Sequence, residues 1–524
     1  MVPGVPLQRD DVTGAKGLAG LVVVSALAHA LAMAWPGTGA ASGWLQWLAL
    51  VGLAWTLCRL TSTRQAALWG ACFGTLSLSG ATWWLFISLN TYGGLPAALA
   101  AVSVLLLSAA LSLYLALACG VWVACRPALN SALSRVLLFA ACWGLAELAR
   151  GVFFTGFPWA AAGYAHVDGG LAALAPWLGV YGMGMVSAAL AMACAEGLTH
   201  AQGRRPWAKA GAACVVAWMA WPYVPAQRAD AVPVPQPLRV ALLQGHVPQD
   251  QKFTNQRAAA LQWYGAQLTQ SSADLVVTPE TALPMATQHL PEGYWPQLVG
   301  HFSAGAQAAL IGLPLLEEGR YHNSAVGLHA GGTYRYDKSH LVPFGEFVPP
   351  LFRWFTQMMN IPLGDFGRGT PTPPTFDVAG QRLAPNICYE DLFGEELAVR
   401  FRDPLQSPTL LVNMSNLAWF GNTVALDQHL TISRLRTLEL ARPMIRATNT
   451  GTTAIIDHRG QVTHRLAPET RGVLVGEVMG QAGPSTFFAW WAGRWGLSPL
   501  WSFCLGVTGL ALGVRWRKSQ KAGL

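Results

Sequence analysis

Long apolar runs fill roughly the first two hundred residues of this 524-residue chain, and another run lies near its end. Hydrophobic residues make up 52% of the chain and charged residues only 11%, against about 25% charged in an ordinary soluble domain. A helix that crosses a bilayer needs about 20 apolar residues. We therefore expect a multi-pass membrane protein. The candidate spans are residues 17–35, 44–58, 67–89, 95–125, 136–154, 171–194, 210–223 and 495–514.

The basic residues orient these spans. If the N-terminus lies inside, each inner segment carries at least two lysines or arginines, whereas the outer side carries Arg150 and Arg494. This asymmetry is the positive-inside pattern. It predicts that the long polar segment after the seventh span faces outward and that the basic C-terminal tail lies in the cytoplasm. The first run also resembles a cleaved signal, but we expect an uncleaved helix. We read the net charge of +8 as membrane orientation and expect no nucleic-acid partner.

The polar segment predicts a separate domain. We expect a transmembrane domain of about seven helices over residues 1–224, an extracytoplasmic domain over 225–484, and a C-terminal transmembrane helix with a cytoplasmic tail over 485–524. A Pro/Ala-rich linker covers residues 225–237. Alternating short elements favour an α/β sandwich. The strand candidates are residues 239–243, 275–278, 309–313, 324–328, 410–413, 453–456 and 473–478, and the helix candidates are 256–270, 296–305, 394–402 and 426–440.

One stretch of this domain, residues 351–364, is unusually apolar for a soluble loop. It fits a buried helix. It also fits an exposed arm that lies on the membrane or gates a lipid pocket.

Cys388 differs from the other cysteines of the chain. Eight of the nine cysteines lie in apolar runs or at their edges, as small buried hydrophobic residues do. Cys388 alone lies in the polar segment, in Asn-Ile-Cys-Tyr-Glu-Asp. The apolar residues around it predict a strand that ends at Cys388, where a turn would present the thiol. No neighbouring cysteine or Cys/His spacing indicates a disulfide or a zinc site.

A thiol nucleophile needs a base and a donor for the oxyanion that it creates. Glu280 follows the strand candidate 275–278 in Thr-Pro-Glu-Thr-Ala-Leu-Pro. Lys338 lies in Tyr-Asp-Lys-Ser-His-Leu-Val-Pro-Phe-Gly-Glu. Taken singly, Glu280 also fits a turn residue and Lys338 a solvated surface charge.

Taken in order, the motifs around Glu280, Lys338 and Cys388 resemble the three motifs of the nitrilase, or carbon–nitrogen hydrolase, superfamily. With the preceding and following spans, the whole chain resembles the apolipoprotein N-acyltransferase family. Residues 154–159, 342–349, 415–421 and 434–451 extend the likeness. The resemblance implies an α-β-β-α sandwich beside a multi-pass helical domain in the bacterial inner membrane, with the catalytic domain in the periplasm.

The resemblance also implies a reaction. Glu280 would deprotonate Cys388, the thiolate would take an acyl chain from a phospholipid, and Lys338 would stabilise the oxyanion. The thioacyl-enzyme would then acylate the α-amine of a diacylglyceryl-modified apolipoprotein. The likeness implies supporting or substrate-binding roles for the following residues: Glu346, Tyr389, Glu390, Trp419 and Phe420. Glu390 also fits a turn residue or the partner of an arginine. It implies no cofactor, and we expect a monomer.

Two positions depart from the family pattern. Leu417 stands where an aspartate is expected before Ala-Trp-Phe, and Phe253 stands where a tryptophan is expected. These departures concern loop contacts and substrate preference. His340 lies near Lys338, but the resemblance does not make it the base. No HExxH motif or acidic cluster near histidines indicates a metal site.

Two alternatives remain at this stage. A membrane-anchored amidase would use the same triad with water as the acceptor, although an anchor needs only one span. A non-catalytic receptor would keep a degenerate domain, although the Glu–Lys–Cys set is intact.

Overall fold

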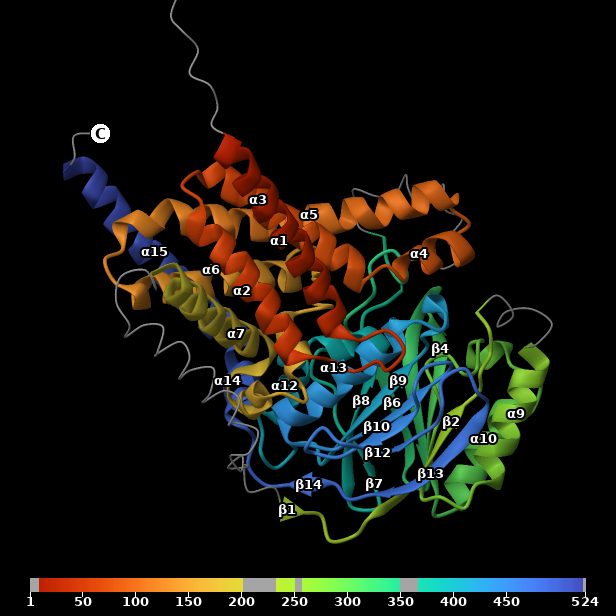
Figure 1. Cartoon of the computed structure of the whole chain (residues 1–524). Helices are drawn as coiled ribbons and strands as arrows, with labels where there is room; N and C mark the ends of the chain where they lie inside the picture. The colour runs from red at the N-terminus through yellow and green to blue at the C-terminus, as the bar shows by residue number, and fades with distance from the viewer. Residues whose placement is uncertain (1–8, 201–231, 250–256, 349–365, 522–524) are drawn as a thin grey trace, which may run out of the picture.

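The computed structural model describes residues 9–200, 232–249, 257–348 and 366–521. A bundle of long helices lies above a sandwich of two β-sheets (Figure 1). The predicted span at 210–223, the position Phe253 and the apolar stretch 351–364 lie outside these described ranges.

The bundle consists of apolar helices from both ends of the chain. Its helices are α1 (Arg9–Met33), α2 (Gly43–Arg59), α3 (Thr63–Ala81), α5 (Ala97–Cys125), α6 (Ala132–Val152), α7 (Ala175–His200) and α15 (Ser498–Lys521). Among the described residues, four helices are long and apolar enough to cross a bilayer, or up to six if each of two bent pairs is one span. The predicted span 44–58 corresponds to α2, which has 17 residues.

The two bent pairs correct the predicted spans. The expected continuous span 67–89 breaks after α3, and its continuation, α4 (Leu85–Ile87) with the π-helix η1 (Ser88–Tyr92), turns by 68°. Near the C-terminus, α14 (Phe487–Trp495) meets α15 at 85°. The expected final span therefore starts after Trp495, because Gly496 has φ +56 and ends α14. Hydropathy alone does not register such backbone breaks.

The sandwich contains two six-stranded sheets, and a third sheet of two strands lies at its margin. The strand order is β13-β2-β3-β4-β5-β6 in the first sheet and β12-β11-β10-β9-β8-β7 in the second sheet. The first sheet is formed by β2 (Leu238–Gln244), β3 (Leu275–Val277), β4 (Ala308–Glu317), β5 (Arg320–His329), β6 (Gly332–Asp337) and β13 (Gly472–Val478). The second is formed by β7 (Phe376–Val378), β8 (Gln381–Ile387), β9 (Leu410–Ser415), β10 (Met444–Thr448), β11 (Ala454–Ile456) and β12 (Val462–Arg465). The small sheet pairs β1 (Val232–Pro233) with β14 (Gln481–Ala482).

Helices cover both outer faces of the sandwich. The first sheet packs on α9 (Arg257–Gln270) and α10 (Tyr294–Ala304), and a second apolar layer fills the space between the sheets. On the other side, α12 (Gly394–Ala398) and α13 (Val424–Leu440) separate the second sheet from the bundle (Figure 1). This is the predicted α-β-β-α order, and the predicted strands and helices of the sandwich all occur. The strand expected to end at Cys388 is β8, which ends one residue earlier.

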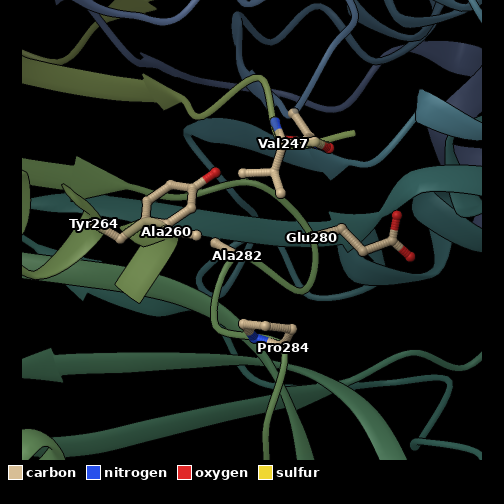
Figure 2. A pocket seen from close by; sticks show the side chains of 7 residues that line it. Val247, Ala260, Tyr264, Glu280, Ala282 and Pro284 are labelled. Atoms are coloured by element: carbon tan, nitrogen blue, oxygen red, sulfur yellow. The ribbon is translucent and has the colours of Figure 1, made fainter. Parts of the chain in front are cut away.

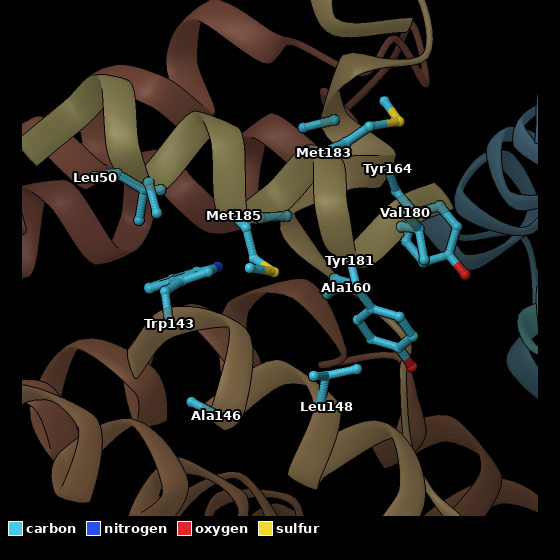
Figure 3. Packing of buried hydrophobic residues seen from close by; sticks show 14 of the residues in the cluster. Leu50, Trp143, Ala146, Leu148, Ala160, Tyr164, Val180, Tyr181, Met183 and Met185 are labelled. Atoms are coloured by element: carbon cyan, nitrogen blue, oxygen red, sulfur yellow. The ribbon is translucent and has the colours of Figure 1, made fainter. Parts of the chain in front are cut away.

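The bundle and the sandwich share one apolar core. Buried Trp143 and Met185 of the bundle belong to the same cluster as Phe401 and Leu435 of the sandwich. Figure 3 shows part of this cluster, where Tyr181 of α7 points toward Leu148 of α6 and Tyr164 lies beside Val180. Burial of apolar side chains is worth roughly 1.5–3 kcal/mol for a large residue. The sandwich is therefore seated on the bundle by packing as well as by its chain connections.

Candidate active site

Cys388 lies where β8 ends and the short 3-10 helix η9 (Cys388–Leu392) begins. Its φ of +53 is in the left-handed region, which non-glycine residues rarely adopt. Strain of this kind persists only where the surrounding structure imposes it, and it clusters at active sites. Here β8 pairs in parallel with β9 up to Ile387, so the backbone is held until the turn. The thiol is thus presented at a strand end, as the sequence predicts.

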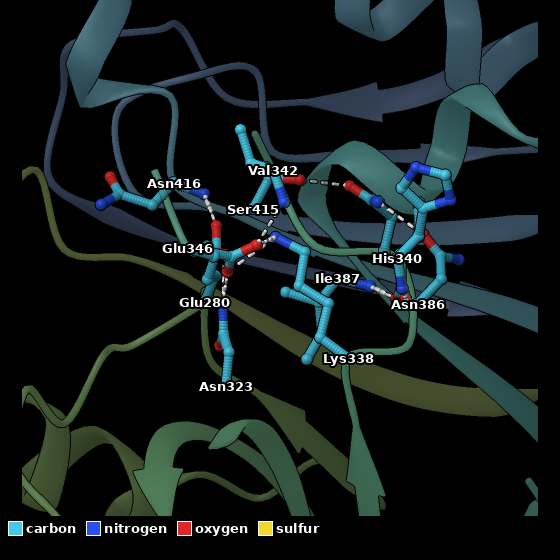
Figure 4. Close-up of polar contacts among 12 residues, drawn as sticks. Glu280, Asn323, Lys338, His340, Val342, Glu346, Asn386, Ile387, Ser415 and Asn416 are labelled. Atoms are coloured by element: carbon cyan, nitrogen blue, oxygen red, sulfur yellow. Dashed lines mark hydrogen bonds and ion pairs between the residues drawn. The ribbon is translucent and has the colours of Figure 1, made fainter. Parts of the chain in front are cut away.

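Glu280 lies in the turn after β3, and its carboxylate is held from two sides. Asn323 Nδ2 donates to Glu280 Oε1 at 2.8 Å. The backbone N–H of Asn416, which follows β9, donates to Glu280 Oε2 at 2.9 Å (Figure 4). Since both donors are buried, the carboxylate cannot rotate freely. The two donors belong to different sheets, so Glu280 lies where the carboxyl ends of β3 and β9 meet.

Lys338 follows β6 and is 1% exposed. Its backbone N–H donates to Asn323 O at 2.8 Å. Its ammonium donates to Glu346 Oε1 at 3.0 Å and to Glu280 Oε1 at 3.4 Å. Burial alone would lower the pKa of Lys338, but the carboxylates of Glu346 and Glu280 outweigh it and hold the pKa above its usual range. Lys338 therefore stays an ammonium, which is a hydrogen-bond donor and not a base.

The charges of the same cluster shift the pKa of Cys388. Burial raises the pKa of its thiol, and the negative charge of Glu280 raises it further, whereas Lys338 lowers it. The net shift is upward, so the resting group at neutral pH is the thiol. Because a thiol is a far weaker nucleophile than a thiolate, this cysteine needs a neighbouring base at the moment of attack. Glu280 is the carboxylate that acts most strongly on it.

Glu346 forms the second carboxylate of the cluster. Its Oε2 lies 2.9 Å from Lys338 Nζ and accepts from the backbone N–H of Val342 at 2.8 Å. Its Oε1 accepts from Asn323 Nδ2 at 2.6 Å. Asn323 therefore bridges both carboxylates (Figure 4). Glu346 therefore holds the ammonium beside Glu280, since both carboxylates contact Lys338 Nζ and share the Asn323 donor.

Glu390 is a hub of hydrogen bonds between the two segments that carry Lys338 and Cys388. Its Oε1 accepts from the backbone N–H groups of Ser339 and His340 at 2.7 and 3.1 Å and from Ser339 Oγ at 2.9 Å. Its Oε2 accepts from Tyr336 OH at 2.5 Å and from the backbone N–H of Ile387 at 2.7 Å. This buried carboxylate therefore ties the loop after β6 to the end of β8. The sequence left an arginine partner open, but these neutral donors are the partners that the geometry gives Glu390.

Tyr389 connects the nucleophile segment to the bundle. Its hydroxyl donates to Gly156 O at 2.8 Å, in the turn after α6. Its ring packs on Phe393 at 5.3 Å between centroids. The residue next to Cys388 thus contacts the helical domain directly.

Trp419 and Phe420 lie in η11 (Ala418–Phe420), also against the bundle. The carbonyl of Trp419 accepts from Ser88 Oγ at 2.7 Å, beyond the bend after α3. The Phe420 ring lies 4.4 Å from that of Trp84 and 6.2 Å from that of Trp159. Trp84 and Trp159 are buried, so these aromatic side chains pack at the junction between bundle and sandwich.

Sequence reasoning missed Asn323 and Asn416 as parts of the site. Asn323 is buried in β5, in a run that is otherwise apolar toward its end, and Asn416 acts through its backbone. The polar side chain in a buried strand was a signal that could have marked Asn323. Leu417, the departure noted above, is buried and contributes no charge here.

A small pocket lies behind Glu280, with no room for a water molecule (Figure 2). It is lined by Val247, Ala260, Tyr264, Glu280, Ala282, Pro284 and Asn449. The Glu280 carboxylate points away from this space, and its Oε1 accepts from Lys338 Nζ. Among the described residues, no group of three or more His, Cys, Asp and Glu side chains is arranged to hold a metal ion.

Two family models match separate parts of the chain. "Apolipoprotein N-acyltransferase N-terminal domain" matches residues 19–195, and "Carbon-nitrogen hydrolase" matches residues 239–483. An apolipoprotein N-acyltransferase from Verminephrobacter eiseniae is 51% identical over 91% of this chain and 92% of its own length. Proteins of the same name from Ralstonia nicotianae and Bordetella bronchiseptica are 44% and 41% identical, over 92% and 91% of this chain and 90% and 93% of their own.

Proposed function

Because this chain belongs to the apolipoprotein N-acyltransferase family, we propose that it acylates the α-amino group of the N-terminal diacylglyceryl-cysteine of apolipoproteins, with a phospholipid as acyl donor. One observation carries the proposed chemistry. Buried Lys338 contacts two carboxylates, and its charge lowers the pKa of the Cys388 thiol. Cys388 lies at a strand end with a positive φ. In this proposal Cys388 is the nucleophile, Glu280 is the base and Lys338 is the oxyanion donor.

In the first half-reaction, the Cys388 thiol passes its proton to Glu280 as the sulfur attacks the ester carbonyl of the phospholipid. The oxyanion that forms accepts a hydrogen bond from Lys338 Nζ. When the intermediate collapses, the ester C–O bond breaks and the glycerol oxygen takes the proton from Glu280. A lysophospholipid leaves, and a thioester remains on Cys388. Removing one oxyanion donor typically costs about 10²–10³ in rate.

In the second half-reaction, the α-amine of the apolipoprotein attacks the thioester. Glu280 takes a proton from the attacking nitrogen, and Lys338 again stabilises the oxyanion. The C–S bond breaks, the sulfur recovers the proton, and the product is an amide. Because a thioester reacts with amines more readily than an oxygen ester, the covalent step suits transfer to an amine.

A membrane-anchored amidase would use the same three residues with water as acceptor. The seating of the sandwich on an extensive apolar bundle favours a lipid donor. An amidase held by an anchor would need only one span, and the described helices offer four or more.

The same proposal includes a location. The chain would be an inner-membrane protein whose sandwich faces the periplasm, and it would act as a monomer. Basic residues at the described helix ends support this orientation. Arg59 ends α2, Arg126 follows α5, and Lys518 and Lys521 lie in the last turn of α15. By the positive-inside rule, these ends belong in the cytoplasm.

Mass spectrometry of the full-length protein after incubation with phospholipid tests the chemistry. The expected result is one acyl adduct on Cys388, which disappears when a diacylglyceryl-cysteine lipopeptide is added and reappears as N-acylated peptide. Cys388→Ala should show neither product while remaining in the membrane. Release of free fatty acid in place of acylated peptide would favour the amidase-like alternative. Full transfer by Cys388→Ala would contradict the mechanism.

A further inference from the structure

The turn after α6 is strained over three consecutive residues. Phe154, Thr155 and Gly156 have φ values of +57, +71 and +79. A positive φ in a non-glycine residue costs of order 1–3 kcal/mol. Burial of Phe154 does not offset this cost, because its side chain is 87% exposed. The geometry of the turn instead determines where its carbonyl groups point.

Two successive carbonyls of this turn contact the active-site segments. His340 Nε2 lies 2.9 Å from Thr155 O, and Tyr389 OH donates to Gly156 O. A Cβ at Gly156 would lie 2.0 Å from Gly151 O, so the close backbone approach requires glycine. His340 stands two residues after Lys338, and Tyr389 directly follows Cys388. One turn of the helical domain therefore holds both chain segments that supply the reacting groups.

The second ring nitrogen of His340 also faces an acceptor. Nδ1 lies 2.9 Å from Glu396 Oε1 on α12. A backbone carbonyl accepts only, so Nε2 carries the proton of the contact to Thr155 O, while Nδ1 faces the Glu396 carboxyl group. The ring stacks on Phe393, with 3.6 Å between ring centroids and 18° between the ring planes. Glu390 faces the same residue through its backbone N–H.

We propose that His340 is a positioning residue of this enzyme. Its imidazole ties the Lys338 segment to the helical domain at Thr155 through Nε2 and to α12 at Glu396 through Nδ1. The seating of the sandwich on the bundle then determines where the Lys338 ammonium stands relative to Cys388. This inference rests on the proposed function, because Lys338 is the oxyanion donor of that mechanism. It adds a positioning histidine outside the Glu–Lys–Cys set.

Two substitutions separate the contacts. His340→Asn keeps an amide N–H near the position of Nδ1 and loses the donor to Thr155 O. His340→Gln places its amide N–H near the position of Nε2 and keeps that donor. Misplacement of a catalytic group by about 1 Å can cost about 10² in rate. We expect His340→Asn to slow thioacyl-enzyme formation by about this factor with KM for phospholipid nearly unchanged, because the donor acts in the transition state. His340→Gln should recover most of the rate.

The controls use the full-length protein in liposomes. His464→Asn changes an exposed histidine on β12 that contacts its neighbour Thr463, and it should leave the rate unchanged. If the two His340 variants unfold at the same temperature, a difference between their rates reflects the position of the donor and not a loss of folding. A normal rate in His340→Asn, or equal losses in both variants, would overturn the inference. Failure of the wild-type chain to form any adduct would count instead against the proposed function.

A spectroscopic measurement tests the contact to Thr155 O independently of activity. In the ¹⁵N spectrum of histidine-labelled protein, the resonances lost in His340→Asn should include a protonated Nε2. A bare Nε2 would contradict the contact even if the enzyme proved inactive under the assay conditions.

Discussion

Lys338 Nζ lies 2.9 Å from Glu346 Oε2 but 3.4 Å from Glu280 Oε1. The ammonium thus lies closer to Glu346 than to Glu280. In the proposed mechanism the longer contact is the one that breaks when Lys338 turns toward a developing oxyanion, while Glu346 continues to hold the ammonium.

Glu346→Gln tests this division of roles. Since Glu346 contributes most to raising the pKa of Lys338, the amide should let burial lower that pKa. The ammonium would then be lost at a lower pH, and the alkaline limb of the acylation profile should move toward neutrality. We expect a slower acylation step at neutral pH, by tenfold or more on the scale of about 10²–10³ for losing the donor outright. A profile and rate identical to those of the wild type would show that Glu346 does not sustain the charge.

Alkylation of Cys388 as a function of pH should distinguish the charges of Glu280 and Lys338. Removing Glu280 takes away a negative charge that raises the thiol pKa, so Glu280→Gln should alkylate at lower pH than the wild type. Removing Lys338 takes away the charge that lowers it, so Lys338→Met should alkylate only at higher pH. Both variants should lose acyl transfer. Mass spectrometry of the iodoacetamide adduct gives the measurement, and shifts in the same direction would contradict the arrangement.

Asn323→Leu should disrupt the site without changing any charge. Its amide donates to both carboxylates, and a buried group left without its partner costs about 1–3 kcal/mol. We expect acylation to fall by roughly 5–150-fold, the rate equivalent of that range. The matched control is Asn130→Leu, at an exposed asparagine that accepts from Lys518. Single-turnover acylation rates compare the two, and equal rates would remove Asn323 from the site.

Asp391 should make the stability of the protein depend on pH. It is fully buried, and burial raises the pKa of its carboxyl from 3.8 to about 6, despite Arg446 and Ser433 nearby. The folded chain therefore binds this proton more tightly than the unfolded chain. The free energy of unfolding should fall as the pH rises through the window from about 4 to about 6, with a slope of up to about 1.4 kcal/mol per pH unit.

Thermal unfolding in detergent from pH 4 to 7 measures this slope, and Asp391→Asn should flatten it. Because the substitution also leaves the buried Arg446 without its carboxylate at 3.9 Å, the slope is the diagnostic quantity and the absolute midpoint is not. An unchanged slope in Asp391→Asn would exclude this carboxyl as its source.

The sequence marks Glu280, Lys338 and Cys388 as candidates because each lies just after a strand, inside a polar motif that the strand pattern makes visible. It does not mark Asn323, since the amide of this residue contacts two carboxylates from distant loops. The bend after α3 was missed for another reason. Hydropathy averages composition along the chain, whereas the break depends on the backbone at Thr82, with φ −122 and ψ 23.

The role of Glu390 shows an intermediate case. Its position beside Cys388 indicated some function, but the sequence could not distinguish a turn acid from an arginine partner. The five donors that meet its carboxylate come from β6, from the loop after it and from β8. Only folding brings these segments together.

The short pairing of β1 with β14 has a consequence for how such a protein is built. Val232 lies opposite Ala482, and Val234 N donates to Gly480 O at 2.9 Å, so the first and last strands of the sandwich region are neighbours. The chain therefore enters and leaves the sandwich region at one place, although the sandwich also packs widely on the bundle. Units whose ends meet can be inserted into a host chain or exchanged without rerouting it.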